Sequence, residues 1–414
     1  MSETAAQPYS ETRIDALGGM RVPEFVLMVA GLMALNALAI DIMLPALDDM
    51  AGSLDAADGN QRQLVIYVYL LGFGVTQLVF GPLSDRYGRR PVLFFSLIGY
   101  ALTAAACMVA PSFGALLAAR FVQGVFAAGG RVVAVSIVRD IFGGRAMARI
   151  MSLVMTIFMA VPILAPSIGQ LILYAGPWQA IFGALTVWAV LIGVWCALRL
   201  PETLPPENKR PLNARATADA YRQVLTHRVT FGYTAASGVV FGALFAFIGA
   251  SEQLFREVFD KEQSFVLWFA LVAGSLSVAN LVNSRMVERY GMRRLSHVAL
   301  IAFIALATIL YGALTAFGER FEIFFPLFIL MFACFGMMGS NFNALAMEPQ
   351  GKIAGTASAL LGFSSTTVAS LIGWMIGRQY DGSSLPIIAG FFLLGVASLA
   401  IIAITERGRL FASR

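Results

Sequence analysis

From Phe25 onward, apolar stretches of about 20 residues recur through this chain of 414 residues almost without pause. A helix of that length rises about 30 Å, the thickness of the hydrocarbon core of a bilayer. Only 13% of the residues are charged, whereas soluble proteins carry about a quarter. The pattern predicts an all-α integral membrane protein and excludes a water-soluble globule. We expect twelve transmembrane helices, at 25–47, 63–83, 91–110, 113–138, 148–174, 178–200, 229–250, 264–286, 295–316, 322–345, 352–376 and 384–404.

One segment breaks this rhythm, because residues 201–228 are polar, proline-rich and basic. Such a segment between apolar stretches is typical of a loop that stays in water. We expect it to join two bundles of six helices. The expected divisions are a cytoplasmic tail at 1–24, a first bundle at 25–200, a cytoplasmic linker at 201–228, a second bundle at 229–404 and a cytoplasmic tail at 405–414.

The two halves repeat a motif. DRYGRR begins at Asp85 and ERYGMRR at Glu288, each between the second and third helix of its half. Parallel repeats of six helices around a central cavity, which rock about a site near the midplane, are a transporter architecture. The repeat therefore predicts a transporter rather than a membrane anchor.

Basic residues are distributed unevenly between the two sides of the expected membrane. If the N-terminus is cytoplasmic and the crossings alternate, most of the 29 lysines and arginines fall in cytoplasmic segments, as the positive-inside rule requires. Both termini are therefore predicted to be cytoplasmic. The few basic residues on the opposite side are Arg62, Arg256, Lys261, Arg320 and Arg378.

Several classes of function are disfavoured. The three cysteines lie far apart inside apolar stretches and the two histidines are separated, so neither a disulfide framework nor a metal or catalytic cluster is expected. A membrane enzyme would need such a cluster. The sequence contains neither a phosphate-binding P-loop nor the basic platform of a nucleic-acid-binding protein. We expect a monomer without cofactor, whose partners are the lipid bilayer, protons and a small-molecule substrate.

Asp41 and Arg120 are charges inside apolar stretches, at matching depths of about 10 Å from the same membrane surface. A carboxylate at this depth costs several kcal/mol unless it is paired, hydrated or protonated. Arg120 is its expected partner. A proton on Asp41 would weaken that attraction and bias a conformational equilibrium. The alternatives are a static ion pair, or a carboxyl group that caps the turn before Pro45.

Arg131 is a third charge within a predicted helix. It lies about three turns beyond Arg120, so the two side chains share a face, with Arg131 about 16 Å deeper. No acid one turn away on this helix is available to pair with it. Its partner is therefore on another helix or is the cargo, which would then be anionic or zwitterionic. The alternative is an arginine that reaches the interface or binds backbone carbonyls.

The segment Gly81–Pro91, GPLSDRYGRRP, closely resembles the signature loop of the major facilitator superfamily. Further segments resemble the drug:proton antiporters of the Bcr/CflA (bicyclomycin-resistance) type, and the resemblance spans the whole chain. It implies proton-coupled export of small amphipathic compounds across a bacterial inner membrane, with Asp41 and Arg120 as the proton-coupling residues. The matching segments are IDIMLPAL at Ile40–Leu47, RFVQG at Arg120–Gly124, VRD at Val138–Asp140, PETLP at Pro201–Pro205 and AGTAS at Ala354–Ser358.

Two glycines of the signature loop, Gly81 and Gly88, are expected to allow close helix contact and a tight turn. In the family, the residues that match Asp85, Arg89 and Asp140 form a charge relay that holds one conformation shut. The resemblance therefore implies a conformational latch, while an effect on topology alone is the alternative. The latch candidates are Gly81, Asp85, Arg86, Gly88, Arg89, Arg90 and Asp140, with Glu288 as the acid of a weaker second copy.

The expected helix 148–174 partly matches the antiporter motif GxxxGPxxGG, of which it retains Pro166 and Gly169. This partial match predicts a kinked, closely packed helix. Aromatic residues that could stack on a ligand complete the candidates, although many aromatics in membrane helices face lipid. A dedicated carrier of an anionic metabolite, by export or symport, is the alternative function. The substrate-cavity candidates are Arg131, Gln123, Tyr67, Tyr69, Phe241, Phe245 and Glu252.

Overall fold

The computed structural model describes residues 17–56, 59–209 and 214–411, and every regular element within them is helical. Twelve helical spans in this part of the chain are long and apolar enough to cross a membrane. Each coincides with one of the expected stretches, so the prediction of an all-α, twelve-span membrane fold is confirmed. The spans are Val22–Ser53, Gly59–Tyr87, Arg89–Met108, Phe113–Ile141, Arg149–Ala175, Gln179–Arg199, Arg228–Val258, Glu262–Tyr290, Met292–Phe317, Phe321–Gln350, Gly355–Gly377 and Leu385–Thr405.

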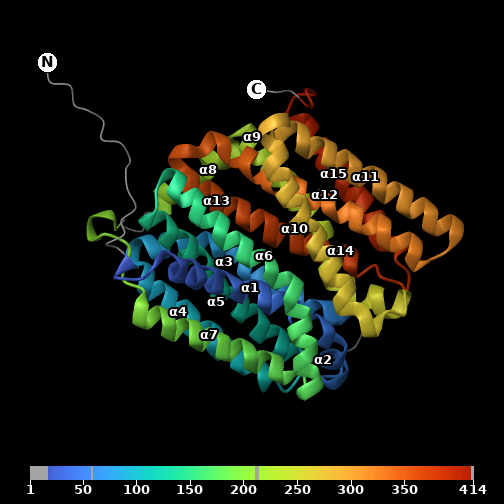
Figure 1. The fold of residues 1–414 in the computed structure, drawn as a ribbon, viewed down its shortest axis with the longest axis horizontal. Coiled ribbons are helices and arrows are strands. Elements are labelled where there is room, and N and C mark those ends of the chain that lie inside the picture. The colour runs from blue at the N-terminus through green and yellow to red at the C-terminus, as the bar shows by residue number, and fades with distance from the viewer. Residues whose placement is uncertain (1–16, 57–58, 210–213, 412–414) are drawn as a thin grey trace.

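The helices gather in two groups that follow the order of the chain (Figure 1). The first comprises α1 (Val22–Asp41), α2 (Leu47–Ser53), α3 (Leu64–Tyr87), α4 (Arg89–Met108), α5 (Phe113–Ile141), α6 (Gly144–Ala175) and α7 (Gln179–Arg199). The second comprises α9 (Arg228–Gln253), α10 (Phe265–Tyr290), α11 (Met292–Phe317), α12 (Phe321–Met347), α13 (Ala354–Phe363), α14 (Ala369–Gly377) and α15 (Leu385–Thr405), and α8 (Ala214–Thr226) lies between the groups in sequence. The short helical turns are η2 (Leu44–Ala46), η3 (Gly59–Gln63), η4 (Pro206–Asn208), η5 (Leu254–Val258), η6 (Glu262–Ser264), η7 (Glu348–Ile353) and η8 (Ser364–Val368).

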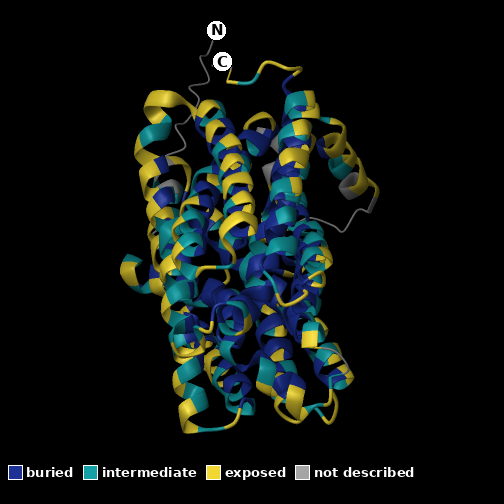
Figure 2. Ribbon diagram, turned by 90° about the vertical axis from the view of Figure 1, so that its right-hand side faces the viewer, coloured by how far each residue is buried: buried dark blue, intermediate teal, exposed yellow. Residues whose placement is uncertain are grey.

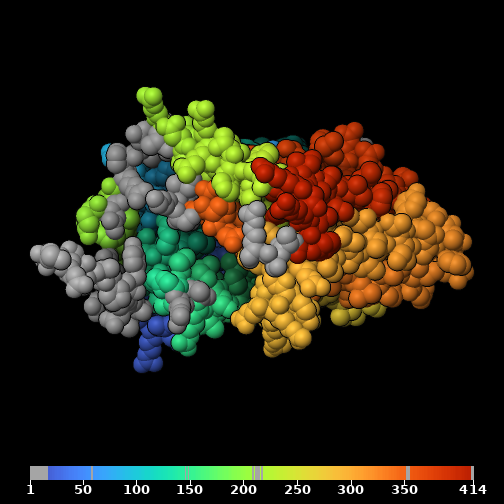
Figure 3. All heavy atoms as spheres, turned by 90° about the horizontal axis from the view of Figure 1, so that it is seen from above, coloured from blue at the N-terminus to red at the C-terminus, as the bar shows by residue number. Residues whose placement is uncertain are grey.

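The two ends of the molecule differ in what they carry. We call the end with α8 the linker end and the end with α2 the distal end (Figure 1). Seen from above, the yellow-green atoms of the segment around α8 lie against the orange-red and red atoms of the second half (Figure 3). The Tyr221 hydroxyl of α8 donates to the Leu78 carbonyl of α3 at 3.2 Å, so α8 is tied to the first half although it leads into the second.

The outer surface of the molecule is apolar, as lipid contact requires. Buried residues gather between the helices and exposed ones lie along their outer sides (Figure 2). Leu102, Leu198 and Ile404 are 66%, 78% and 77% exposed. Exposing such side chains to water would cost free energy, whereas contact with the hydrocarbon of the bilayer does not.

The first membrane span is broken near its distal end. α1 ends at Asp41, the chain turns through η2, and helix resumes as α2. Pro45 explains the break, because it has no N–H to donate to the Asp41 carbonyl four residues earlier. The helix expected over 25–47 therefore ends at Asp41, which occupies a helix C-terminus, and the rest of that stretch lies in the turn, in η2 and at the start of α2.

Two glycines of the predicted motifs differ in how closely they are packed. A Cβ atom on Gly169 of α6 would collide with the Ile42 carbonyl oxygen and lie 3.3 Å from the Pro45 ring, so only glycine lets α6 lie against the break in the first span. A Cβ atom on Gly81 would meet nothing within 4 Å. The close helix contact expected at Gly81 is therefore wrong, because no helix in the described part of the chain approaches that position.

We predict that Gly169→Ala lowers the Tm of the detergent-solubilised protein, because overpacking a close contact costs about 1–3 kcal/mol. Gly81→Ala is the matched control and should leave the Tm unchanged or raise it slightly, since alanine is the better helix former. Thermal unfolding followed by fluorescence measures both. Equal Tm values for the two variants would contradict the packing of α6 against the broken span.

Candidate functional site

Arg120 lies on α5 inside the first half and is 0% exposed. Its guanidinium donates through Nε to the Val65 carbonyl at 3.0 Å, through Nη2 to the Ala39 carbonyl at 2.8 Å and through Nη1 to Gln123 Oε1 at 2.6 Å. The centre of the Tyr69 ring lies 4.2 Å from its Cζ. Neutral oxygen atoms and an aromatic face therefore surround the charge.

The broken span explains why the Ala39 carbonyl is available. In an unbroken helix it would accept from the backbone N–H of Met43, but the helix ends at Asp41 and leaves its last carbonyls without helical donors. Arg120 donates to this free carbonyl at the negative end of the α1 dipole, where a cation is favoured. The break at Pro45 thus creates the binding site for the arginine.

Asp41 is 4% exposed and has no hydrogen bond or ion pair to any residue that the structure describes. The expected ion pair between Asp41 and Arg120 is therefore wrong for this conformation. The physical reason is that the arginine is bound to a carbonyl of the same helix end, at Ala39. A carboxyl group so placed, also at the negative end of a helix dipole, is stable only when it is protonated or hydrated.

A network of ion pairs joins the two halves at the distal end. Arg62 of η3 is 3% exposed and binds Asp48 of α2 at 2.6 Å. It also binds two carboxylates of the second half, Glu252 of α9 at 3.2 Å and Glu257 of η5. One arginine of the first half therefore holds three acidic groups, two of them across the boundary between the halves.

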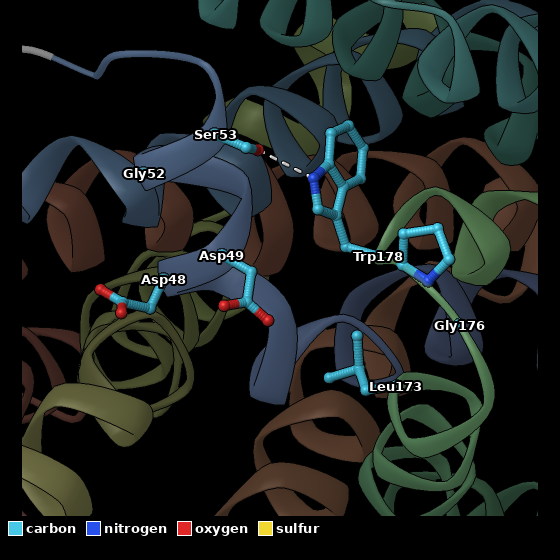
Figure 4. A pocket seen from close by; sticks show the side chains of 8 residues that line it. Asp48, Asp49, Gly52, Ser53, Leu173, Gly176 and Trp178 are labelled. Carbon is cyan, nitrogen blue, oxygen red and sulfur yellow. Dashed lines mark hydrogen bonds between the residues drawn. The ribbon is translucent and has the colours of Figure 1, made fainter.

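Further contacts close the same network. Arg256 of η5 binds Asp48 at 2.6 Å and Glu252 at 3.1 Å. In Figure 4, Asp48 extends from the side of α2 opposite Trp178, whose ring nitrogen donates to Ser53. The Tyr380 hydroxyl donates to Glu257 at 3.0 Å. Burial, and then this hydrogen bond, raise the pKa of Tyr380 above its usual range, so that it remains a neutral donor.

Uncharged groups continue the closure toward the centre of the molecule. Gln63 Nε2 donates to Gln253 Oε1 at 2.5 Å and to the Gly377 carbonyl at 3.2 Å, and the Tyr67 hydroxyl donates to the Phe245 carbonyl at 3.1 Å. These bonds all run between the halves. The structure is therefore closed at its distal end, and Glu252 and Tyr67, which we expected in the substrate cavity, take part in that closure.

The signature loop brings together the residues expected to form a latch. Arg89 is 2% exposed and binds Asp85 at 2.6 Å and Asp140 of α5 at 2.7 Å. Gly88 has a φ of 104°, a conformation that suits glycine, and a Cβ there would lie 2.7 Å from Glu202. Glu202 in turn accepts the backbone N–H of Arg89 at 2.9 Å, which caps the start of α4. Three helices of the first half and the start of the linker therefore meet at this cluster.

The second copy of the motif is built differently from our expectation. Glu288 is exposed and has no partner in the described part of the chain. Arg293 instead binds Glu406 at 2.9 Å and Glu348 at 3.6 Å. Met292 separates Gly291 from this arginine, which turns its side chain about 100° further round α11 than Arg89 is on α4. The prediction of Glu288 as the acid is therefore wrong.

The remaining candidates are less closely connected. Arg86 is exposed, whereas Arg90 donates to the Ala197 carbonyl at 2.9 Å. Phe241 packs edge-on against Phe335, with ring centres 6.2 Å apart. Pro166 lies inside α6. Arg131 is half-buried, and its Cζ lies 5.7 Å from the centre of the Phe73 ring.

Sequence reasoning missed most of the distal network and the acids of the second motif copy. Arg62 was recognised only as one of the few basic residues on its side of the membrane, although its position beside Gln63 at the start of an apolar span was a signal. Glu202 stood inside the quoted PETLP segment, and Glu406 follows the last span as Glu202 follows the sixth. That correspondence between the halves could have identified Glu406.

The twelve-span fold, with charges inside the spans and charge clusters at both ends, is that of a membrane transporter. Residues 29–374 match the model of the Major Facilitator Superfamily. The chain therefore belongs to this family.

Curated relatives extend along almost the whole chain. An uncharacterized MFS-type transporter, YdgK of Bacillus subtilis, is 31% identical over 379 residues, which cover 90% of this chain and 93% of that protein. A bicyclomycin resistance protein homolog of Haemophilus influenzae is 29% identical and covers 92% and 96%. The multidrug resistance protein MdtL of Salmonella typhi is 28% identical and covers 85% and 87%. The resemblance to the bicyclomycin-resistance type is confirmed.

Solved structures share the fold. A D-xylose-proton symporter superimposes with a TM-score of 0.73 at 14% identity, covering 91% of this chain and 95% of that one. The human organic anion transporter MFSD10 (TETRAN) gives a TM-score of 0.65 at 18% identity, with 92% and 100% covered. Relatives and fold are those of transporters, so the expectation that the chain is not an enzyme is confirmed.

We predict that Arg62→Gln opens the distal end, because removing one partner of a buried charge network costs about 3–5 kcal/mol. Ser251→Cys reports the change, since Ser251 is buried in α9 near the network and the three native cysteines are also buried. A membrane-impermeant maleimide should label this cysteine about tenfold faster, or more, in the Arg62→Gln background. Arg378→Gln removes an exposed distal charge outside the network and should have no effect. Equal labelling in both backgrounds would show that Arg62 does not hold the end closed.

We predict that Glu406 contributes to the stability of the fold in a pH-dependent way. Burial alone would raise the pKa of this carboxyl group, but hydrogen bonds from Arg293 and Tyr233 hold it below its usual value. A lowered folded-state pKa stabilises the protein above the unfolded value of about 4.3, and the effect is lost as the pH falls through the folded pKa. Glu406→Gln should therefore have a lower Tm than the original protein at pH 7. This difference in Tm should disappear in acid. Glu288→Gln is the control, and an equal loss of Tm there would contradict this assignment.

Proposed function

We propose that the protein is a proton-coupled exporter of small amphipathic compounds that works by alternating access. Membership of the major facilitator superfamily and the relatives named for drug resistance support efflux. The observation that carries proton coupling is the buried carboxyl group of Asp41, which has no cationic partner among the described residues although Arg120 approaches the same helix end.

The coupling step is an exchange of partners at the end of α1. In the present conformation Asp41 carries a proton, and Arg120 is satisfied by the Ala39 carbonyl. When the proton leaves, the carboxylate is a stronger acceptor than a carbonyl and draws the guanidinium toward it. The last turn of α1 then changes its contacts.

This turn is continuous with the distal closure. Residues 42–46 connect Asp41 to α2, which carries Asp48, a partner of both Arg62 and Arg256. A change in the last turn of α1 therefore acts on the network that joins the halves. Protonation of Asp41 can in this way shift the equilibrium between the conformations of the transporter. The cluster of Arg89, Asp85 and Asp140 serves as the latch at the linker end.

The proposed orientation follows from the basic residues. The linker end, with α8 and the signature loop, is cytoplasmic, and the distal end faces the periplasm. The protein lies in a bacterial inner membrane as a monomer. Its parts are the first bundle at 25–200, the linker at 201–228 and the second bundle at 229–404, with tails at 1–24 and 405–414.

We predict that Asp41→Asn abolishes transport driven by a pH gradient but retains substrate binding, because asparagine has the same shape and cannot exchange a proton. The assay uses proteoliposomes under an imposed gradient, with cationic, neutral and anionic naphthalene derivatives as probes. Asp49→Asn, on the exposed side of α2, is the matched control and should transport like the original protein. Undiminished gradient-driven flux through Asp41→Asn would reject Asp41 as the proton site.

A further inference from the structure

Arg131, which is half-buried, differs from the buried arginines of the membrane domain. Arg62 binds three carboxylates, Arg89 binds two, and Arg120 has three oxygen acceptors. Within the described chain, the ring of Phe73 is the one aromatic or polar group with which the Arg131 side chain interacts, and none of its guanidinium N–H groups donates a hydrogen bond. A guanidinium presents five donors, which interior sites normally satisfy.

At the position of Arg131 in the membrane, guanidinium donors without acceptors cost free energy. It lies ten residues before the end of α5 at Ile141, which places its Cα about 15 Å along the helix from the linker end. A charge at that depth in a transmembrane helix faces the protein interior or a water-filled space, and it marks a pathway for ions or substrate.

Free space borders Arg131 on its own helix. Gly129 is tightly packed, because a Cβ there would lie 2.7 Å from the Phe80 ring. Gly130 is also buried, yet a Cβ atom there would meet no neighbouring atom within 4 Å. The side of α5 next to Arg131 therefore borders an internal space rather than a packed neighbour, and Arg131 itself is only half-buried.

We infer that Arg131 binds the anionic group of the transported molecule, so that the substrates are amphipathic organic anions. Phe73 supports one face of the guanidinium, and its edge remains free to donate two parallel hydrogen bonds to an oxyanion such as a carboxylate. This inference rests on the proposed transport function, since it assigns the ligand of that transporter's cavity.

The test measures equilibrium binding to the full chain in lipid nanodiscs, without a pH gradient. The probes are 1-naphthoate and the neutral 1-naphthamide, which have nearly the same size and shape. We expect the original protein to bind 1-naphthoate about tenfold more tightly, or more. Arg131→Gln should remove this preference by weakening 1-naphthoate alone, and Arg131→Lys, which keeps the charge but loses the paired donors, should retain part of it. Arg222→Gln on α8 is the control for loss of an exposed arginine.

Two results would overturn the inference: absence of a preference for 1-naphthoate in the original protein, or equal effects of Arg131→Gln on both probes. If the substituted proteins do not fold, the original protein still decides. Phenylglyoxal modifies arginine, and 1-naphthoate should slow its reaction at Arg131 while 1-naphthamide does not. Arg222 in the same sample reports the unprotected rate, and equal rates at Arg131 with either probe would reject the site.

These results separate the anion site from the proposed function. Because binding is measured without a gradient, loss of proton coupling leaves the preference for 1-naphthoate unchanged. Binding of 1-naphthoate without any gradient-driven flux would refute the exporter and keep the site. Gradient-driven flux of neutral or cationic probes, with no preference for 1-naphthoate, would refute the site and keep the exporter.

Discussion

The break that Pro45 imposes on the first membrane span determines how Asp41 and Arg120 are arranged in the first half. It ends α1 at Asp41 and leaves the Ala39 carbonyl without a helical donor. Arg120 donates to that carbonyl and so remains buried without an acidic partner among the described residues. Asp41 is consequently left at the negative end of a helix dipole with no cation from the described residues bound to it, a position that a carboxyl group tolerates best when it carries a proton.

The same break connects the proposed proton site to the closure of the molecule. α6 reaches the turn after Asp41 because Gly169 has no side chain to strike the Ile42 carbonyl. Beyond the turn, α2 presents Asp48 to Arg62 and Arg256, which hold the halves together at the distal end. The proposed exchange of partners at α1 and the proposed movement of the halves therefore share one continuous segment of backbone.

Periodicity in the sequence predicted the twelve spans well, because about 20 apolar residues are needed wherever a helix crosses a bilayer. Motif matching also located Arg89, Asp85 and Asp140, which the structure brings together in one cluster. It failed where the outcome depended on tertiary contacts. The pairing of Asp41 with Arg120 was inferred from depth alone, which cannot reveal a competing carbonyl. The distal network joins residues about 200 positions apart, and no local pattern links Arg62 to Glu257.

The assignment of a proton to Asp41 is the central claim, and infrared difference spectroscopy tests it directly. The spectrum of the original protein minus that of Asp41→Asn, both in lipid at neutral pH, isolates the carbonyl stretching vibration of this one side chain. The account predicts the band of a protonated carboxyl group, which disappears as the pH is raised. A difference spectrum that contains only the bands of an ionised carboxylate throughout the neutral range would contradict it.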